Sequence, residues 1–226
     1  MNKLSPMVCA RPPEYDVVTH FIRLSKPYTD RRPVRAIAFD LDSTLTRPYL
    51  DFTRLRAQLG LPEGDILHWA DSLPPRQQAE AFATIEAFEQ DGVDHVAWND
   101  GAQETLAALQ ARGLPVAIIT RNSRTSLTAV CAHLDIRVDV LIAREDATPK
   151  PDPACVRLAS ARLGVQVETL LMVGDFRHDT EAGRAAGAMT VLLTNGKTPT
   201  WTVEADLVIH RLPELLTYVE SVTSAA

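Results

Sequence analysis

The chain has 226 residues, and 23 lysine and arginine residues against 29 aspartate and glutamate residues give it a formal net charge of −6. This balance provides no basic surface for nucleic acid, and no apolar run approaches the roughly 18 residues that a membrane span requires. Cys9, Cys131 and Cys155 are widely spaced and form no Cys-x-x-Cys pair, which argues against a disulfide framework or a zinc site. Residues 1–13 lack the apolar core of a signal peptide, so we expect a cytoplasmic protein.

A monomer and a homodimer are both compatible with the sequence.

Residues 1–33 precede the first strongly predicted strand and are interpreted as a partly ordered N-terminal extension. Residues 17–24 could form a short strand or helix that packs on the core, and the proline and charged residues of 26–33 would end it. The apolar, β-forming residues that start at Val34 then predict a buried strand that leads directly into Asp40 and Asp42. Carboxylates are costly to desolvate without a positive partner, so this strand end predicts a bound cation or a chemical role.

The pattern changes from strand to helix after the first strand. Amphipathic helices are predicted over residues 50–59, 63–70 and 74–90. Pro74 and Pro75 suit the first turn of the last of these helices. No strand pattern interrupts the segment, so residues 48–98 are predicted to form a small all-helical domain. It is inserted into an α/β core domain that consists of residues 34–47 and 99–226.

Helices and strands alternate regularly in the rest of the chain. Helices are predicted over residues 101–112, 124–134, 153–163, 179–186 and 213–219, and strands over residues 115–120, 138–143, 169–174, 190–193 and 207–209. Gly113, Gly164 and Gly187 directly follow three of these helices, at the position where glycine commonly ends a helix. This βαβ alternation predicts a Rossmann-like parallel sheet flanked by helices on both faces.

Polar residues gather at the carboxyl ends of the predicted strands, which is where open parallel sheets bind their ligands. In chain order they are Asp40, Asp42, Thr120, Arg121, Asn122, Lys150, Asp175 and Asp179. Neighbouring carboxylates raise one another's pKa unless a cation compensates them, and oxygen ligands without His or Cys indicate a hard ion, usually Mg²⁺. A metal, a lysine and the hydroxyl of Thr120 together indicate that the substrate carries a phosphate group.

The chain resembles the haloacid dehalogenase superfamily over residues 34 to about 220, with four motifs in the family's order. They are Asp40-Leu41-Asp42-Ser43-Thr44-Leu45-Thr46, Thr120 after an apolar strand, Lys150, and Gly174-Asp175-Phe176-Arg177-His178-Asp179. The resemblance is to phosphoglycolate phosphatase-like members with a small helical cap over the site. It implies a phosphoric monoester hydrolase that uses Mg²⁺ and acts on a small-molecule phosphate ester.

The resemblance also implies roles for individual residues. Asp40 would be the nucleophile that forms an aspartyl-phosphate, and Asp42 would be the general acid and base. The implied metal ligands are Asp40, the backbone carbonyl of Asp42, Asp175 and Asp179. Thr120 and Lys150 complete the catalytic set, and the candidate substrate-binding residues are Thr120, Arg121, Asn122 and Lys150. Asp42 favours a phosphatase over a dehalogenase, because a halide leaving group needs no proton.

Two alternatives stay open on the same fold: a sugar-phosphate mutase and a non-catalytic, phosphate-binding regulatory protein. Two residues also depart from the usual family motifs, since Ser43 replaces a glycine and Phe176 replaces a small serine. Ser43 must reach an unusual backbone conformation. Phe176 could narrow the mouth of the site, but we expect it to pack under the inserted helices. His178 is interpreted as a surface histidine without a role in the chemistry.

Overall fold

The computed structural model describes residues 23–24, 32–61, 63–202 and 204–223, so most of the N-terminal extension lies outside it. Its centre is one sheet of seven strands in the order β1-β7-β6-β5-β2-β3-β4. The strands are β1 (Arg23–Leu24), β2 (Ala36–Phe39), β3 (Val116–Ile119), β4 (Val140–Ile142), β5 (Leu170–Gly174), β6 (Met189–Leu193) and β7 (Leu207–Ile209). All neighbouring pairs are parallel except β1 with β7. The predicted Rossmann-like α/β fold is therefore confirmed.

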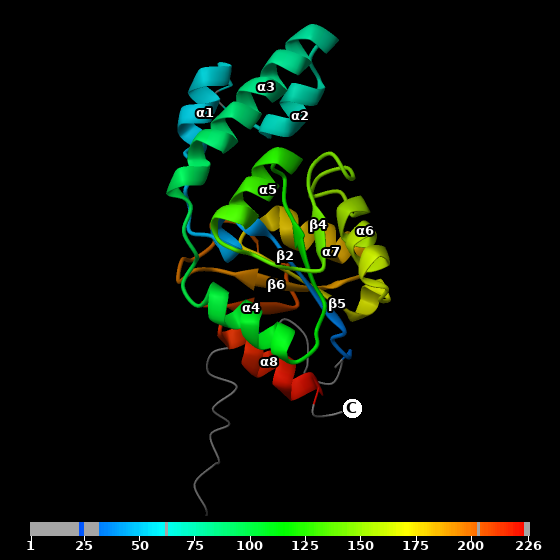
Figure 1. The fold of residues 1–226 in the computed structure, drawn as a ribbon. Coiled ribbons are helices and arrows are strands. Elements are labelled where there is room, and N and C mark those ends of the chain that lie inside the picture. Colours follow the sequence, from blue (N-terminus) through cyan, green and yellow to red (C-terminus); the bar gives the residue numbers. More distant parts are fainter. Residues whose placement is uncertain (1–22, 25–31, 62, 203, 224–226) are drawn as a thin grey trace, which may run out of the picture.

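Helices cover the sheet and also form a separate group at one end of the molecule. They are α1 (Phe52–Leu59), α2 (Ile66–Asp71), α3 (Pro75–Gly92), α4 (Ala102–Ala111), α5 (Arg124–His133), α6 (Ala154–Leu163), α7 (Arg177–Ala186) and α8 (Glu214–Thr223). Figure 1 shows α1, α2 and α3 together at the end of the molecule opposite α4 and α8. None of the helices that the structure describes is both long and apolar enough to cross a bilayer.

The central strand β2 shows how the sequence builds two hydrophobic layers. Ile37 and Phe39 belong to the core beneath α4, α5 and α8, whereas Ala36 and Ala38 belong to the core beneath α6 and α7. Alternate residues of a strand face opposite sides of a sheet, so one short segment serves both layers. Burial of a large apolar side chain such as Phe39 contributes about 1.5–3 kcal/mol, and these contacts fix the strand on which the site is built.

The inserted helices α1, α2 and α3 pack around a small hydrophobic cluster of their own. Its buried members are Leu55, Leu67, Ala70, Ala81, Ile85 and Phe88. The two connections to the core run side by side: the Arg47 N–H donates to the Ala97 carbonyl, and the Asn99 N–H donates to the Leu45 carbonyl, both at 2.9 Å. The segment thus leaves and re-enters the core at neighbouring points. The predicted division into two domains stays a prediction.

Several element boundaries differ from the sequence-based expectation, and β1 and α7 bear on the site or the sheet. Of residues 17–24, for which a short strand and a helix were both possible, the structure describes Arg23 and Leu24 as strand β1, which pairs with β7 through Arg23 and Val208. Helix α7 starts at Arg177, two residues before its predicted start, so that Asp179 lies in its first turn. There the Asp179 carboxylate accepts the backbone N–H of Phe176 at 3.1 Å, which satisfies a donor that the helix start leaves open.

Candidate active site

Asp40 lies at the carboxyl end of β2 and is held there by the sheet. Its backbone N–H donates to the Val173 carbonyl of β5 at 2.8 Å. The chain then turns back within residues 41–45, where Ser43 adopts a left-handed φ of 61°. Such a φ is uncommon for a residue with a Cβ. Asn195 donates to the Ser43 carbonyl at 2.8 Å and Asn99 to the Thr44 carbonyl at 2.9 Å, so these two amides stabilise the turn.

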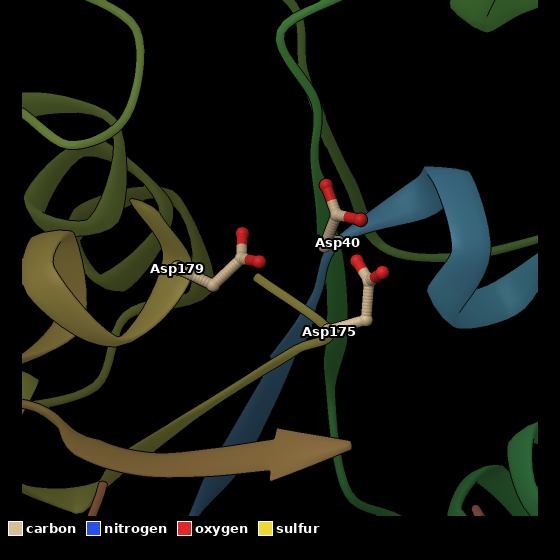
Figure 2. Close-up of side chains that lie close together, drawn as sticks. All are labelled: Asp40, Asp175 and Asp179. Atoms are coloured by element: carbon tan, nitrogen blue, oxygen red, sulfur yellow. The ribbon is translucent and has the colours of Figure 1, made fainter. Parts of the chain in front are cut away.

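Lys150 connects the ends of β2 and β3 to the first turn of α7. Its Nζ donates to Asp40 Oδ1 at 2.6 Å, to Asp179 Oδ1 at 2.6 Å and to the Ile119 carbonyl at 2.8 Å, and the residue is only 2% exposed. Asp40, Asp175 and Asp179 each offer a carboxylate oxygen within 4.8 Å of the others (Figure 2). The structure therefore brings the predicted lysine and three of the predicted metal ligands into one cluster.

Gly174 makes this close approach possible. A Cβ at position 174 would lie 2.1 Å from Asp179 Cγ, so any side chain there would displace the carboxylate. The glycine at the end of β5 thus lets the first turn of α7 bring Asp179 directly over the strand. This contact gives a physical reason for glycine in the fourth motif.

Burial and like charge govern the ionisation of the cluster. Burial is the main cause of the raised pKa of Asp40, which Lys150 opposes and the neighbouring carboxylates increase. Burial, followed by the charge of Asp179, raises the pKa of Asp175 to about 7. Burial alone would lower the pKa of Lys150, but Asp179 and Asp40 outweigh it and raise the pKa, so the ammonium stays charged. Three carboxylates face one ammonium here, and this all-oxygen set fits a hard divalent cation such as Mg²⁺.

Asp42 points to a different group of side chains. Its Oδ2 accepts from Asn122 Nδ2 at 2.8 Å and from Thr120 Oγ1 at 3.4 Å. Asp42 Oδ1 and the Tyr49 hydroxyl are both buried without a hydrogen bond of ordinary geometry among the described residues. Burial raises the pKa of Asp42 to about 6, although the nearby hydroxyl of Tyr49 lowers it. Asp42 can therefore gain and lose a proton near neutral pH, and Asn122 contacts this carboxyl group.

Arg121 joins the inserted helices to the core. Its Nη2 donates to both carboxylate oxygens of Asp65 at 2.6 Å, and its Nη1 lies 2.5 Å from His178 Nδ1. The interpretation of His178 as a surface histidine is wrong, because its side chain is only 16% exposed. Burial, followed by the charge of Arg121, lowers the pKa of His178 to about 4, so the ring is neutral at pH 7.

Phe176 differs from its expected position under the inserted helices. The residue is 39% exposed, and its ring meets those of His178 and Trp201 edge to face, with centroids 4.9 and 5.0 Å away. Its neighbour Asp179 still reaches Lys150, so the larger side chain removes no contact of the carboxylate cluster. The aromatic group instead covers the outer side of His178.

Glu89, in α3, forms another contact between the inserted helices and the core. The carboxylate is buried and accepts from the Ser123 N–H at 3.0 Å, from Ser126 Oγ at 3.1 Å and from Arg144 Nη1 at 2.5 Å. Sequence reasoning missed it, although Glu89 lies four residues after Ile85 on the apolar face of α3, where a charged residue is unusual. Tyr49 and Asp65, by contrast, carry no sequence signal of this kind.

Comparison with known proteins gives consistent relationships. Residues 34–187 match the family model described as haloacid dehalogenase-like hydrolase. A haloacid dehalogenase-like hydrolase domain-containing protein of Arabidopsis thaliana is 31% identical over 173 residues, which are 71% of this chain and 71% of that protein. A phosphoglycolate phosphatase of Chromobacterium violaceum is 28% identical over 212 residues, which are 80% of this chain and 95% of that protein.

Solved structures share the fold. A predicted phosphoglycolate phosphatase from Haemophilus somnus superposes with a TM-score of 0.66 at 19% identity, over 82% of this chain and 97% of that one. A HAD family hydrolase from Deinococcus radiodurans, crystallised with bound phosphate and sodium, gives a TM-score of 0.63 at 23% identity, over 84% and 97% of the two chains. At these identities the likeness describes the fold.

Proposed function

Because the chain belongs to the haloacid dehalogenase-like hydrolases, we propose that it is a Mg²⁺-dependent phosphatase that hydrolyses a small organic phosphomonoester through an aspartyl-phosphate. The coarser conclusion, a phosphoric monoester hydrolase, follows from the family and from the phosphoglycolate phosphatases among its relatives. The observation that carries the finer proposal is the separation of two aspartates at the end of β2. Asp40 shares Lys150 with Asp179, whereas Asp42 turns toward Asn122.

The two aspartates would perform different steps. An oxygen of Asp40 attacks phosphorus, the bond from phosphorus to the ester oxygen breaks, and Asp42 gives that oxygen its proton. Asp42 then takes a proton from the water that attacks the aspartyl-phosphate, which releases phosphate and regenerates the Asp40 carboxylate. Thr120 and Lys150 would hold the phosphoryl oxygens during both steps. The raised pKa of Asp42, about 6, supports its alternation between acid and base.

Asp40, Asp175 and Asp179, with the backbone carbonyl of Asp42, would hold Mg²⁺, which when bound supplies positive charge beside the phosphoryl oxygens. We also propose that residues 48–98 act as the cap over this site. Their own hydrophobic cluster supports this role, as do the contacts of Asp65 and Glu89 with the core. Acting as a cap, α1 to α3 would exclude water and contact the leaving group.

The first experiment is the release of inorganic phosphate from a panel of phosphorylated metabolites that includes phosphoglycolate. We expect Mg²⁺-dependent release that EDTA abolishes and added Mg²⁺ restores, because the carboxylate cluster needs a cation before it can accept a phosphate. Hydrolysis that EDTA leaves unchanged would contradict the metal requirement. Phosphate release without an added sugar bisphosphate would argue against the mutase alternative, and no release from any compound would favour the non-catalytic one.

Asp42→Asn tests the second aspartate. We expect kcat/KM for an alkyl phosphate to fall about 10²–10⁴-fold, because the amide cannot protonate the leaving oxygen. The fall should be smaller for 4-nitrophenyl phosphate, whose leaving group needs little protonation. Asparagine keeps the shape of the side chain, and Asp100→Asn, which makes the same change at an exposed residue outside the carboxylate cluster, serves as the control. Equal losses on both substrates would contradict a role in proton donation.

A further inference from the structure

Three side chains from three segments meet at the rim of the site. Arg121 directly follows Thr120, His178 directly precedes Asp179, and Asp65 is the residue before α2 in the inserted helices. The Arg121 guanidinium donates to both oxygens of Asp65 at 2.6 Å and lies 2.5 Å from the His178 ring. Asp65 is the member of this group that the inserted segment contributes, so it belongs to the part of the protein that we propose as the cap.

Asp65 is fixed from two sides. Its Oδ1 also accepts the backbone N–H of His68 at 3.0 Å, which places the carboxylate at the start of α2. Burial would raise the pKa of Asp65, but hydrogen bonds from Arg121 and His68 and the charge of Arg121 outweigh it and lower the pKa. Asp65 is therefore ionised at neutral pH and compensates the charge of Arg121.

The ion pair of Asp65 and Arg121 links the residue after Thr120 to the inserted helices, on the side toward which a leaving group would extend. The phosphoryl group would bind beside Thr120 and Lys150, at the carboxyl ends of the strands, so the rest of the molecule must extend toward the inserted helices. Arg121 is the guanidinium next to that path, and a carboxylate is the partner that a guanidinium binds best. The second buried arginine at this edge, Arg144, already pairs with Glu89. A carboxylate on the leaving group could therefore reach Arg121 only in competition with Asp65.

We propose that Asp65 is a specificity-determining residue: by occupying Arg121 it selects against phosphate esters whose leaving group carries a carboxylate, in favour of esters with an uncharged leaving group. The proposal rests on the proposed phosphatase function and names its substrate class. The selection acts through charge, since the carboxylate of Asp65 both blocks the guanidinium and repels a second anion.

The test compares two substrates of similar size in Asp65→Asn: phosphoglycolate, and 2-hydroxyethyl phosphate, in which a hydroxymethyl group replaces the carboxylate. We expect the ratio of kcat/KM for phosphoglycolate to that for 2-hydroxyethyl phosphate to rise about tenfold or more, because Arg121 becomes available. Asparagine is also a good residue before a helix, so α2 keeps its start. Asp51→Asn is the matched control, since Asp51 stands in the same position before α1.

A double variant tests whether Asp65 changes the substrate ratio through the guanidinium of Arg121. Asp65→Asn combined with Arg121→Gln should return the substrate ratio close to that of the Arg121→Gln single variant, because the guanidinium is gone. A ratio that Asp65→Asn leaves unchanged, or that changes equally with Asp51→Asn, would overturn the proposal. If the wild type hydrolyses neither phosphoglycolate nor 2-hydroxyethyl phosphate, that result counts against the proposed phosphatase function toward these two substrates. Calorimetric binding of the same two compounds to wild type and Asp65→Asn then decides whether Asp65 discriminates against the carboxylate.

Discussion

Replacing Asp40 by asparagine is expected to lower phosphatase turnover by a factor on the order of 10³ or more. The amide keeps the size of the side chain but has no anionic oxygen to attack phosphorus, so the aspartyl-phosphate cannot form. Phosphate release at saturating Mg²⁺ measures the effect. The matched control is Asp100→Asn, which makes the same change at an exposed residue that pairs with Arg47 outside the cluster. Turnover within about tenfold of wild type would contradict a nucleophilic role for Asp40.

The same variant should remain folded. Asp40 has a raised pKa, so the folded protein binds this proton more tightly than the unfolded chain does. A carboxyl group of this kind costs stability as the pH rises through its raised pKa, and the cost is fully present at high pH. Asparagine removes that cost and leaves Asp179 as a partner for Lys150. In metal-free buffer at pH 8 we therefore expect the melting temperature of Asp40→Asn to equal or exceed that of wild type.

Removal of Lys150 should have the largest effect on stability. Lys150→Met is expected to lower the free energy of unfolding by about 3–5 kcal/mol in metal-free buffer, because the ammonium is lost while buried carboxylates remain. Urea unfolding with and without Mg²⁺ measures this loss, and Mg²⁺ should recover part of it by supplying positive charge. The exposed Lys197→Met is the control. A variant as stable as wild type without metal would show that the lysine does not compensate Asp40 and Asp179.

The stability of Lys150→Met should also depend on pH. Without the lysine, the pKa of Asp40 should rise further above its value in the unfolded chain, because Lys150 is the group that lowers it. The folded state then binds protons more tightly than the unfolded state, so stability increases as the pH falls through the raised pKa toward the value of the unfolded chain. We therefore expect the difference from wild type to be smaller at pH 5.5 than at pH 8.

The sequence predicted the parts of the site that follow strands. Asp40, Thr120 and Asp175 come directly after apolar runs, and the ends of parallel strands meet at one edge of the sheet, so local patterns were enough to bring them together. The order of helices and strands was predictable for the same reason, since periodicity and terminal glycines are local signals. Strand β1 lies within residues 17–24, for which the sequence allowed a short strand or a helix, and two described residues are too few for periodicity to decide between them.

The contacts with the inserted helices could not be predicted. Asp65 meets Arg121 across 56 positions of sequence, and Glu89 meets Arg144 across 55. An aspartate before a helix is explained locally as a helix start, which hides its second partner. His178 was misplaced for a related reason, because its burial depends on Arg121 and on the ring of Phe176 rather than on its own segment.

The paired connections beside Arg47 and Asn99 also limit what the insertion costs the core. The chain leaves and re-enters the core at hydrogen-bonded neighbours, so the two ends of residues 48–98 are held together. For the stability of the core, the segment therefore acts as a closed loop. The entropy of closing a flexible loop grows only logarithmically, by about 0.6 kcal/mol for each doubling of its length. At this point in the chain, segments of very different size could therefore be exchanged at little thermodynamic cost to the sheet, and the inserted helices could diverge while the carboxylate cluster stays unchanged.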